Sequence, residues 1–284
     1  MNTRIARAKI NLYLHVAAPD ASGYHPLQSL VAFADVGDRL DIVDQPGLTI
    51  SGPFAYGLST GEDNLVLKAV RLFEETTGRK VKHGFHLDKQ LPLASGIGGG
   101  TADATACLHL LRAFHMPDLC DDVLNAIALR LGADGPMCLQ SAALIAEGYG
   151  ETLTPMILPT LPGVLVNPLV ECSTKLVYQA FDEGKHIENI DVKLMFQRKF
   201  DISIFLEALR ETRNDLQAPA VDIRPAIADV LVTLDGQPET RLARMSGSGA
   251  TCFALCESKK DADALGSRMQ ALWPDAWVRA CTLN

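Results

Sequence analysis

The 284-residue chain lacks three features that would each have placed it in a distinct class of proteins. It has no excess of positive charge: its formal net charge is −8, whereas general nucleic-acid binders build affinity from clustered Lys and Arg. No apolar run reaches the ~18 residues that a membrane span needs. Residues 1–5 also lack the apolar core of a secretion signal. These absences predict a cytoplasmic protein with no nucleic-acid or membrane partner.

The chain also lacks paired cysteine motifs. Its seven cysteines are odd in number, and no two of them form a Cys-x-x-Cys pair. Zinc sites and disulfide frameworks have characteristic cysteine spacings, and this spacing matches neither. We therefore expect reduced, mostly buried thiols.

Length and composition are those of an ordinary globular protein. The chain is 48% hydrophobic and 21% charged. With ~150 residues per domain as a prior, it should form two domains or one large one. Three prolines at 155, 159 and 162 mark a candidate boundary, which gives domains 1–155 and 156–284. Because strands and helices mix without a regular βαβ period, the sequence predicts the α+β class.

Apolar periodicity and turn residues predict the individual elements. A helix should begin at Asp63-Asn64 and end at Gly78, Asp121 should cap a helix that ends at Gly132, and residues 132–136 should form a tight turn. A polar segment covers residues 183–191. The expected strands cover 7–16, 29–34, 39–43, 85–87, 142–146, 163–166, 251–256 and 277–281; the other helices cover 101–114, 121–131, 173–181, 202–212, 222–234 and 259–272.

The most informative segment is a glycine loop before the helix expected at 101–114. Residues 96–100 contain four glycines, so backbone amides can turn toward a phosphate at the positive end of that helix. The loop lacks the lysine of a Walker motif, since Thr101 follows Gly100, and it lacks the third glycine of a dinucleotide fingerprint. A phosphorylated ligand is the first hypothesis, and a surface loop without a ligand is the alternative.

Two polar residues project together from the first expected strand. In the alternating segment 7–16, Lys9 and Asn11 share one face. Asp134 is the carboxylate in the turn at 132–136. Taken alone, Lys9 is compatible with a solvated strand face, and Asp134 with an ordinary turn aspartate.

Three segments together resemble a known family: 8–12 (AKINL), 91–103 (LPLASGIGGGTAD) and 245–250 (MSGSGA). The chain resembles the GHMP-type small-molecule kinases over nearly its whole length. Residues 23–27, 63–65 and 132–136 resemble the subgroup that acts on a cytidine diphosphate derivative of methylerythritol. The resemblance implies an α+β fold with an N-terminal half like ribosomal protein S5 domain 2, a ferredoxin-like C-terminal half and an active site in the cleft between them.

The resemblance also implies a reaction, its cofactors and its residues. ATP, accompanied by Mg²⁺, would give its γ-phosphoryl group to the 2-hydroxyl of the substrate. Asp134 would be the general base and Lys9 its cationic neighbour, while Asn11, Tyr24, His25 and Thr174 would bind substrate. The ATP-binding residues would be Asn64, Pro92, Leu93, Ala94, Ser95, Gly96, Ile97, Gly98, Gly99, Gly100, Thr101 and Ala102.

Several of these roles have a simpler alternative. Tyr24 and His25 could be an exposed loop pair, and Asn64 and Thr174 could cap helices. Glycine occupies the position of the magnesium-binding serine of other GHMP kinases, so the metal ligand stays open between Thr101 and Asp103.

The same residues are compatible with other functions. The rivals are a kinase for homoserine, mevalonate or a sugar, an inactive nucleotide-binding module and an S5-like RNA-binding protein. The partner expected is a small molecule that carries cytidine diphosphate, bound by a monomer or a homodimer.

Overall fold

The computed structural model describes residues 2–184 and 201–284, so most of the polar segment predicted at 183–191 lies outside the described residues. The chain forms two compact units, and each takes three stretches of sequence. Unit 1 contains the segment that ends at Lys9, Val36–Leu93 and Gly98–Ser141. Unit 2 contains Ile10–Asp35, Ala94–Ile97 and Ala142–Asn284. The boundary at residue 155 stays a prediction.

Two long strands contribute to both units. Strand β1 (Thr3–Val16) pairs with strand β2 (Leu27–Val43). Both faces of β1 are buried from Ala8 to Val16, so the expected half-buried strand is wrong for this stretch. The two strands predicted at 29–34 and 39–43 form the single strand β2. Its apparent break has a local cause: a Cβ on Gly37 would lie 2.2 Å from the carbonyl oxygen of Ala6, and Asp38 is buried.

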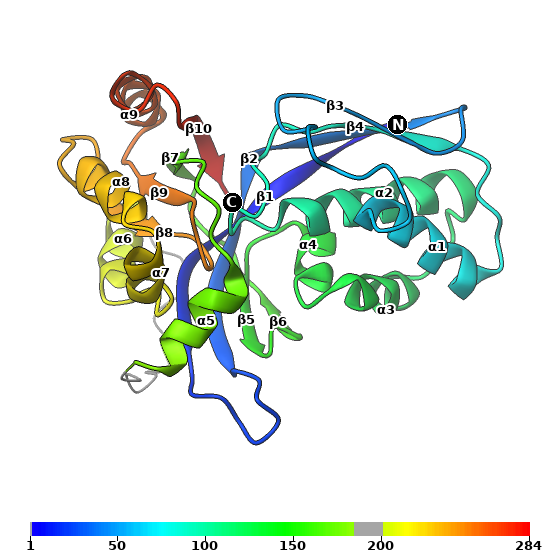
Figure 1. The fold of residues 1–284 in the computed structure, drawn as a ribbon, viewed down its shortest axis with the longest axis horizontal. Helices are drawn as coiled ribbons and strands as arrows, with labels where there is room; N and C mark the ends of the chain where they lie inside the picture. Colours follow the sequence, from blue (N-terminus) through cyan, green and yellow to red (C-terminus); the bar gives the residue numbers. More distant parts are fainter. Residues whose placement is uncertain (1, 185–200) are drawn as a thin grey trace. The chain divides into compact units, whose positions relative to one another are not determined.

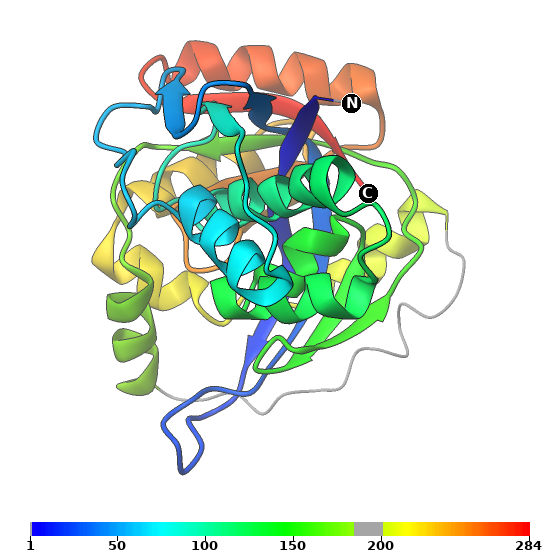
Figure 2. The ribbon, with the colours of Figure 1, turned by 90° about the vertical axis from the view of Figure 1, so that its right-hand side faces the viewer.

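Unit 1 combines a small sheet with four helices. Strand β4 (Gly84–Asp88) pairs antiparallel with β2, with Val43 opposite Gly84, and parallel with β3 (Leu48–Ser51). The helices pack against one another as a group (Figures 1 and 2). They are α1 (Leu65–Thr77), α2 (Gly99–His115), α3 (Asp121–Leu131) and α4 (Gly135–Gln140).

The ends of these helices test the predicted caps. Asn64 caps α1 by accepting a hydrogen bond from the Val66 amide at 2.9 Å, and Gly78 ends it with a φ of 68°, as predicted. The predicted cap of α3 is wrong, because Cys120 occupies the cap position and Asp121 is the first helical residue, where its charge favours the helix dipole. The turn predicted at 132–136 runs directly into the short helix α4, which the sequence did not predict.

Unit 2 is built on antiparallel strands. In the order β2-β10-β7-β9-β8, neighbouring strands pair, while β5 pairs with β2 and with β6. Strands β6 and β8, which are four residues long, were not predicted. The bounds are β5 (Leu144–Gly148), β6 (Thr152–Pro155), β7 (Leu161–Asn167), β8 (Leu242–Met245), β9 (Cys252–Leu255) and β10 (Trp277–Leu283).

The helices of unit 2 follow the prediction with one exception. The helix expected at 222–234 is divided into α7 (Gln217–Ile223) and α8 (Ala226–Asp235), because Pro225 disfavours a helical Arg224. The remaining helices are α5 (Thr174–Asp182), α6 (Ile202–Arg210) and α9 (Lys259–Leu272).

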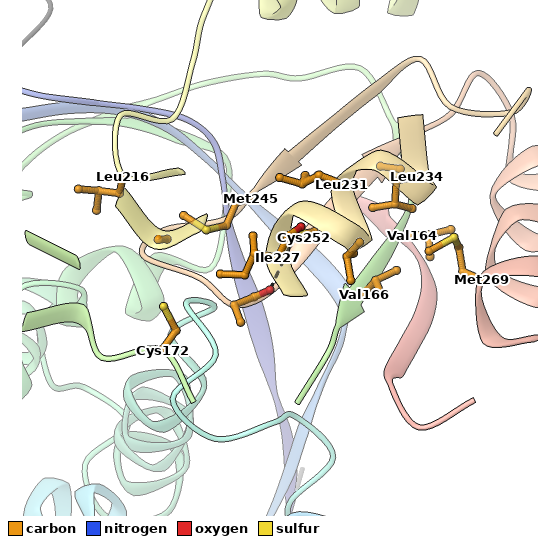
Figure 3. Packing of buried hydrophobic residues seen from close by; sticks show 14 of the residues in the cluster. Val164, Val166, Cys172, Leu216, Ile227, Leu231, Leu234, Met245, Cys252 and Met269 are labelled. Carbon is orange, nitrogen blue, oxygen red and sulfur yellow. Dashed lines mark hydrogen bonds between the residues drawn. The ribbon is translucent and has the colours of Figure 1, made fainter. Parts of the chain in front are cut away.

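A buried apolar cluster lies between the sheet and the helices of unit 2. Figure 3 shows Ile227 and Leu234 of α8 and Met269 of α9 with Val164 and Val166 of β7. All seven cysteines are free and only Cys120 is exposed, which confirms the predicted thiols. The mixture of antiparallel sheet and packed helices confirms the α+β class.

Candidate active site

The N-terminus of α2 has the geometry of an anion-binding site. Gly98 precedes the helix with a φ of 66°. Because glycine has no side chain, it cannot cap the first-turn amides of Gly99, Gly100 and Thr101. Such amides lack intrahelical partners and carry the positive end of the helix dipole. A Cβ on Gly98 would lie 3.4 Å from the Lys9 Cβ, so this end of the helix adjoins Lys9.

Lys9 and Asp134 form an ion pair beside that helix end. The Lys9 Nζ lies 2.9 Å from the Asp134 Oδ2, and the two side chains are 9% and 37% exposed. Burial lowers the pKa of Lys9, but the adjacent Asp134 carboxylate raises it, and the net pKa lies above 10.5. The ammonium therefore stays protonated at neutral pH. Lys9 is not a solvated strand residue, and its partner keeps access to a reactant.

The backbone of α4 explains why Asp134 faces Lys9. Asp134 occupies the N-cap position of α4, yet in the described chain its side chain makes no cap hydrogen bond. Its main-chain carbonyl accepts the Cys138 amide at 2.9 Å. The carboxylate thus bonds to Lys9 rather than to its own turn, as an ordinary turn aspartate would do.

A second lysine, which the sequence did not single out, lies behind the same helix end. The Lys89 Nζ donates to the Asp38 Oδ2 at 2.5 Å and to the Asp103 Oδ2 at 2.6 Å, and its side chain is 2% exposed. The pKa of Lys89 is lowered by burial and raised more by the two carboxylates. Burial, together with the nearby Asp38, raises the pKa of Asp103 above its ordinary range despite Lys89. We call these three residues the Lys89 triad.

In unit 2, the second glycine turn packs against Gly96. A Cβ on Gly96 would lie 2.6 Å from the Ser246 carbonyl oxygen and 2.7 Å from that of Gly249, so only glycine fits there. The Ser246 hydroxyl also donates to the Gly96 carbonyl oxygen at 3.3 Å. The segment 245–250 therefore supports this part of the loop through its backbone, a role that the sequence pattern did not specify.

Asn11 is fixed by the same turn. Its amide N–H donates to the Ser246 hydroxyl at 3.1 Å, and its side-chain Nδ2 donates to the Ser29 hydroxyl at 2.8 Å. The Asn11 Oδ1 is buried with no hydrogen-bond partner among the described residues. A buried acceptor without a donor is costly, so this oxygen suits a ligand that brings a hydroxyl or amine.

The structure separates Tyr24 from His25. The His25 Nδ1 faces the Ala17 carbonyl oxygen at 3.0 Å, its Nε2 lies 3.4 Å from an Asp182 carboxylate oxygen, and its ring lies 4.9 Å from that of Tyr178 on α5. Tyr24 instead packs edge-on against Tyr149, with 6.0 Å between ring centroids, and is 68% exposed.

Sequence reasoning missed both Tyr149 and Tyr178. No local spacing links either residue to the loop at 23–27, because the contacts form only in the fold. The Tyr149 hydroxyl bonds to Asp20, which also accepts the Ser22 and Tyr24 amides and so shapes that loop.

The two remaining candidates make protein contacts. Asn64 uses its Oδ1 for the cap of α1 and its Nδ2 for the Ser59 carbonyl oxygen, at 2.7 Å, so its capping alternative is confirmed. Thr174 is the first residue of α5 and does not cap it. Its hydroxyl lies 2.8 Å from that of Ser248.

Comparison with known proteins decides the family. The family "GHMP kinases N terminal domain" matches residues 64–142, and "GHMP kinases C terminal" matches residues 193–275. The 4-diphosphocytidyl-2-C-methyl-D-erythritol kinase of Caulobacter vibrioides (strain NA1000 / CB15N) is 48% identical over 291 residues, with 98% of each chain covered. The chain belongs to the GHMP kinase family.

Other relatives of this GHMP kinase agree. The enzyme of the same name from Bradyrhizobium sp. (strain BTAi1 / ATCC BAA-1182) is 44% identical, covering 98% of this chain and 95% of that one. A crystal structure of 4-(cytidine 5'-diphospho)-2C-methyl-D-erythritol kinase has a TM-score of 0.81 at 32% identity, with 99% of both chains covered. The mevalonate kinase of L. major shares the fold, with a TM-score of 0.68 at 18% identity over 100% of this chain and 96% of that one.

Two further properties of this GHMP kinase concern membrane-spanning helices and metal ligands. In the part of the chain that the structure describes, no helix is long and apolar enough to cross a membrane, and no three His, Cys, Asp or Glu side chains gather as a metal cluster would. Of the two metal-ligand candidates, Asp103 does not fit the role, because its carboxylate is buried against Lys89. Thr101 is half-buried and, among the described residues, makes no ion pair with Lys89.

Proposed function

We propose that this GHMP kinase transfers the γ-phosphoryl group of ATP to the 2-hydroxyl of 4-diphosphocytidyl-2-C-methyl-D-erythritol, a step of non-mevalonate isoprenoid precursor biosynthesis. The observation that carries the proposal is the 48% identity over 98% of both chains with a kinase of that name. The Lys9–Asp134 pair beside the α2 N-terminus supports the reaction type.

Asp134 acts as the general base in this proposal. The substrate hydroxyl oxygen attacks the γ-phosphorus, the bond from that phosphorus to the β–γ bridging oxygen breaks, and the hydroxyl proton goes to the Asp134 carboxylate. Lys9 stays protonated, orients the carboxylate and offsets charge on the transferring group. A positioned base contributes about 10²–10⁴-fold, and phosphoryl transfer otherwise depends on alignment and charge stabilisation.

The α2 N-terminus and the glycine loop hold the phosphates. The amides of Gly99, Gly100 and Thr101 supply donors, and the absence of a Cβ at Gly98 permits a close approach beside Lys9. Mg²⁺ prefers hard oxygen ligands and is usually bound together with substrate phosphates. The Thr101 hydroxyl is the protein oxygen that we propose to hold it, and the ion would neutralise phosphate charge.

Unit 2 supplies the groups for the cytidine end. The rings of His25 and Tyr178 offer aromatic surface for a pyrimidine, and the exposed ring of Tyr24 offers a stacking face. The unpaired Asn11 Oδ1 accepts a substrate hydroxyl, and Thr174 lies next to Ser248 as a second polar contact.

A labelling experiment tests the proposal. The enzyme, with Mg²⁺ and ATP labelled at the γ-phosphate, is offered the cytidylyl methylerythritol, homoserine and mevalonate in parallel. We expect label only in the first compound. Label in homoserine or mevalonate would assign another substrate. A His25→Ala variant should raise the KM for the cytidylyl compound without changing the KM for ATP.

A further inference from the structure

The Lys89 triad surrounds the two ends of the glycine loop. Lys89 lies directly after β4, three residues before Pro92, and Asp103 lies in α2, which the loop precedes. Asp38 comes from β2. One ammonium group therefore joins three elements of unit 1 at the base of the loop.

The triad connects the backbone at the loop entry to helix α2 through side-chain hydrogen bonds. The Asp38 Oδ1 accepts the amides of Gln90 at 2.6 Å and Leu91 at 2.8 Å, which sets the direction in which the chain enters the loop. The bond from Lys89 to Asp103 ties that entry to α2. A Cβ on Gly99 would lie 3.3 Å from the Lys89 Nζ, so the ammonium lies directly behind the first turn of the helix.

Stability alone is a weak reason for such a cluster. Taking charges out of water costs free energy that a buried ion pair recovers only partly, and apolar residues of similar volume often serve as well. The triad also leaves the Asp103 Oδ1 buried without a partner among the described residues, which is a further cost. What an apolar cluster could not provide is a fixed, directional connection between the loop entry and the helix.

We propose that Lys89 is a positioning residue for the phosphate-binding amides, acting with Asp38 to hold the first turn of α2 in register with the entry to the glycine loop. This inference rests on the proposed function, since it assumes that the α2 N-terminus binds ATP. Lys89 contributes through the backbone and not by contact with the reacting atoms.

The test compares Lys89→Met with Asp103→Asn in the full chain. Lys89→Met keeps an unbranched side chain of nearly the same length but removes the connection, whereas Asp103→Asn keeps an oxygen that accepts from Lys89. We expect Lys89→Met to raise the Kd and KM for Mg-ATP by between about tenfold and a hundredfold, the scale of an ångström-size misplacement. The kcat at saturating ATP, the KM for the alcohol substrate and all constants of Asp103→Asn should stay within about twofold.

A double variant separates positioning from folding. Lys89→Met leaves the buried carboxyl groups of Asp38 and Asp103 facing each other without a cation, and adding Asp103→Asn replaces one of them with a neutral amide. We expect Lys89→Met/Asp103→Asn to recover the thermal midpoint while its ATP affinity stays weak. The proposal would be overturned if the folded double variant bound ATP as tightly as the unchanged protein does, because the lost affinity of Lys89→Met would then reflect only its lower stability.

A Gly98→Ala variant distinguishes a failure of the role proposed for Lys89 from a failure of the proposed function. If Gly98→Ala weakens ATP binding in isothermal titration and the double variant does not, only the role of Lys89 is wrong. If neither variant weakens ATP binding, the phosphates bind elsewhere, and the proposed function loses the support of the α2 N-terminus.

Discussion

Lys9 and Lys89 are both paired with aspartates in unit 1, but the two pairs differ in exposure and in what else they hold. Lys9 has one carboxylate partner, and that partner is 37% exposed. Lys89 has two, Asp38 and Asp103, and all three side chains are nearly fully buried. The exposed Asp134 carboxylate can therefore accept a proton from a reactant, whereas the buried Lys89 triad connects backbone segments rigidly.

The backbone contacts of the aspartates sharpen the contrast. Asp134 makes no cap bond within the described part of α4 and is left with Lys9, whereas Asp38 accepts two main-chain amides. A carboxylate committed to amides cannot move to meet a substrate. Exposure and free hydrogen-bonding capacity, rather than the presence of a lysine, thus distinguish Asp134, the proposed base.

The largest expected effect is on turnover when the exposed carboxylate is changed. Asp134→Asn should lower kcat by about 10²–10⁴-fold, because the amide cannot take the hydroxyl proton. Its affinity for ATP should hardly change, since the phosphate-binding amides are untouched. Steady-state kinetics and isothermal titration measure both quantities. Normal turnover in Asp134→Asn would remove the assigned base and with it the contrast between the two pairs.

The next effect is on folding, and it should separate the two lysines. Lys89→Met should reduce the free energy of unfolding by about 3–5 kcal/mol, because it leaves the buried Asp38 carboxylate, which faces Asp103, without a cation. Lys9→Met should cost about 1 kcal/mol or less, because Asp134 can be hydrated instead. Urea unfolding of both variants gives the comparison, and equal losses would mean that exposure does not distinguish the pairs.

A glycine pair tests the phosphate site next to Lys9. Gly98 and Gly78 have nearly the same left-handed φ, 66° and 68°, but Gly78 ends α1 with nothing within 4 Å of a Cβ. Alanine at either position should cost about 1–2 kcal/mol of stability from backbone strain. Only Gly98→Ala should also weaken ATP binding. Similar ATP affinities for the two variants in isothermal titration would argue against the cradle.

The smallest effect, taken per pH unit, is a change in the pH dependence of stability. Burial raises the pKa of Asp103, so the folded protein holds a proton that the unfolded chain releases. The free energy of unfolding should therefore fall as pH rises from the ordinary range near pH 4 toward the raised folded-state pKa, by at most about 1.4 kcal/mol per pH unit. Asp103→Asn has no such proton and should lack this part of the slope.

Urea titrations from about pH 5 to about pH 9 measure that slope in both proteins. Identical slopes would show that Asp103 ionises normally. In that case the Lys89 triad would carry a net negative charge behind the helix end.

Sequence reasoning identified the elements that have strong local signals. The glycines before α2, the Asn64 cap and the Gly78 terminus depend on backbone chemistry that neighbouring residues specify. The roles assigned to Lys9 and Asp134 came from resemblance, and the structure places the two side chains in contact although 125 residues separate them.

The Lys89 triad and the aromatic contacts had no local signal. Asp38 lies between the two predicted strands 29–34 and 39–43, in the part of β2 where Gly37 closely approaches Ala6. The contact of His25 with Tyr178 joins a loop to a helix far along the chain. Such pairs depend on the register of the whole fold, which short-range periodicity does not determine.

The discontinuous units have a consequence for any attempt to shorten the gene. A fragment that stops at residue 155 contains every stretch of unit 1, yet it also carries residues 10–35, which belong to unit 2. In the intact chain, Phe33 exchanges two main-chain hydrogen bonds with Asn284, and Ala34 lies opposite Leu283. A shortened chain therefore lacks the β10 partner of β2, and a premature stop codon leaves an apolar strand edge open to aggregation.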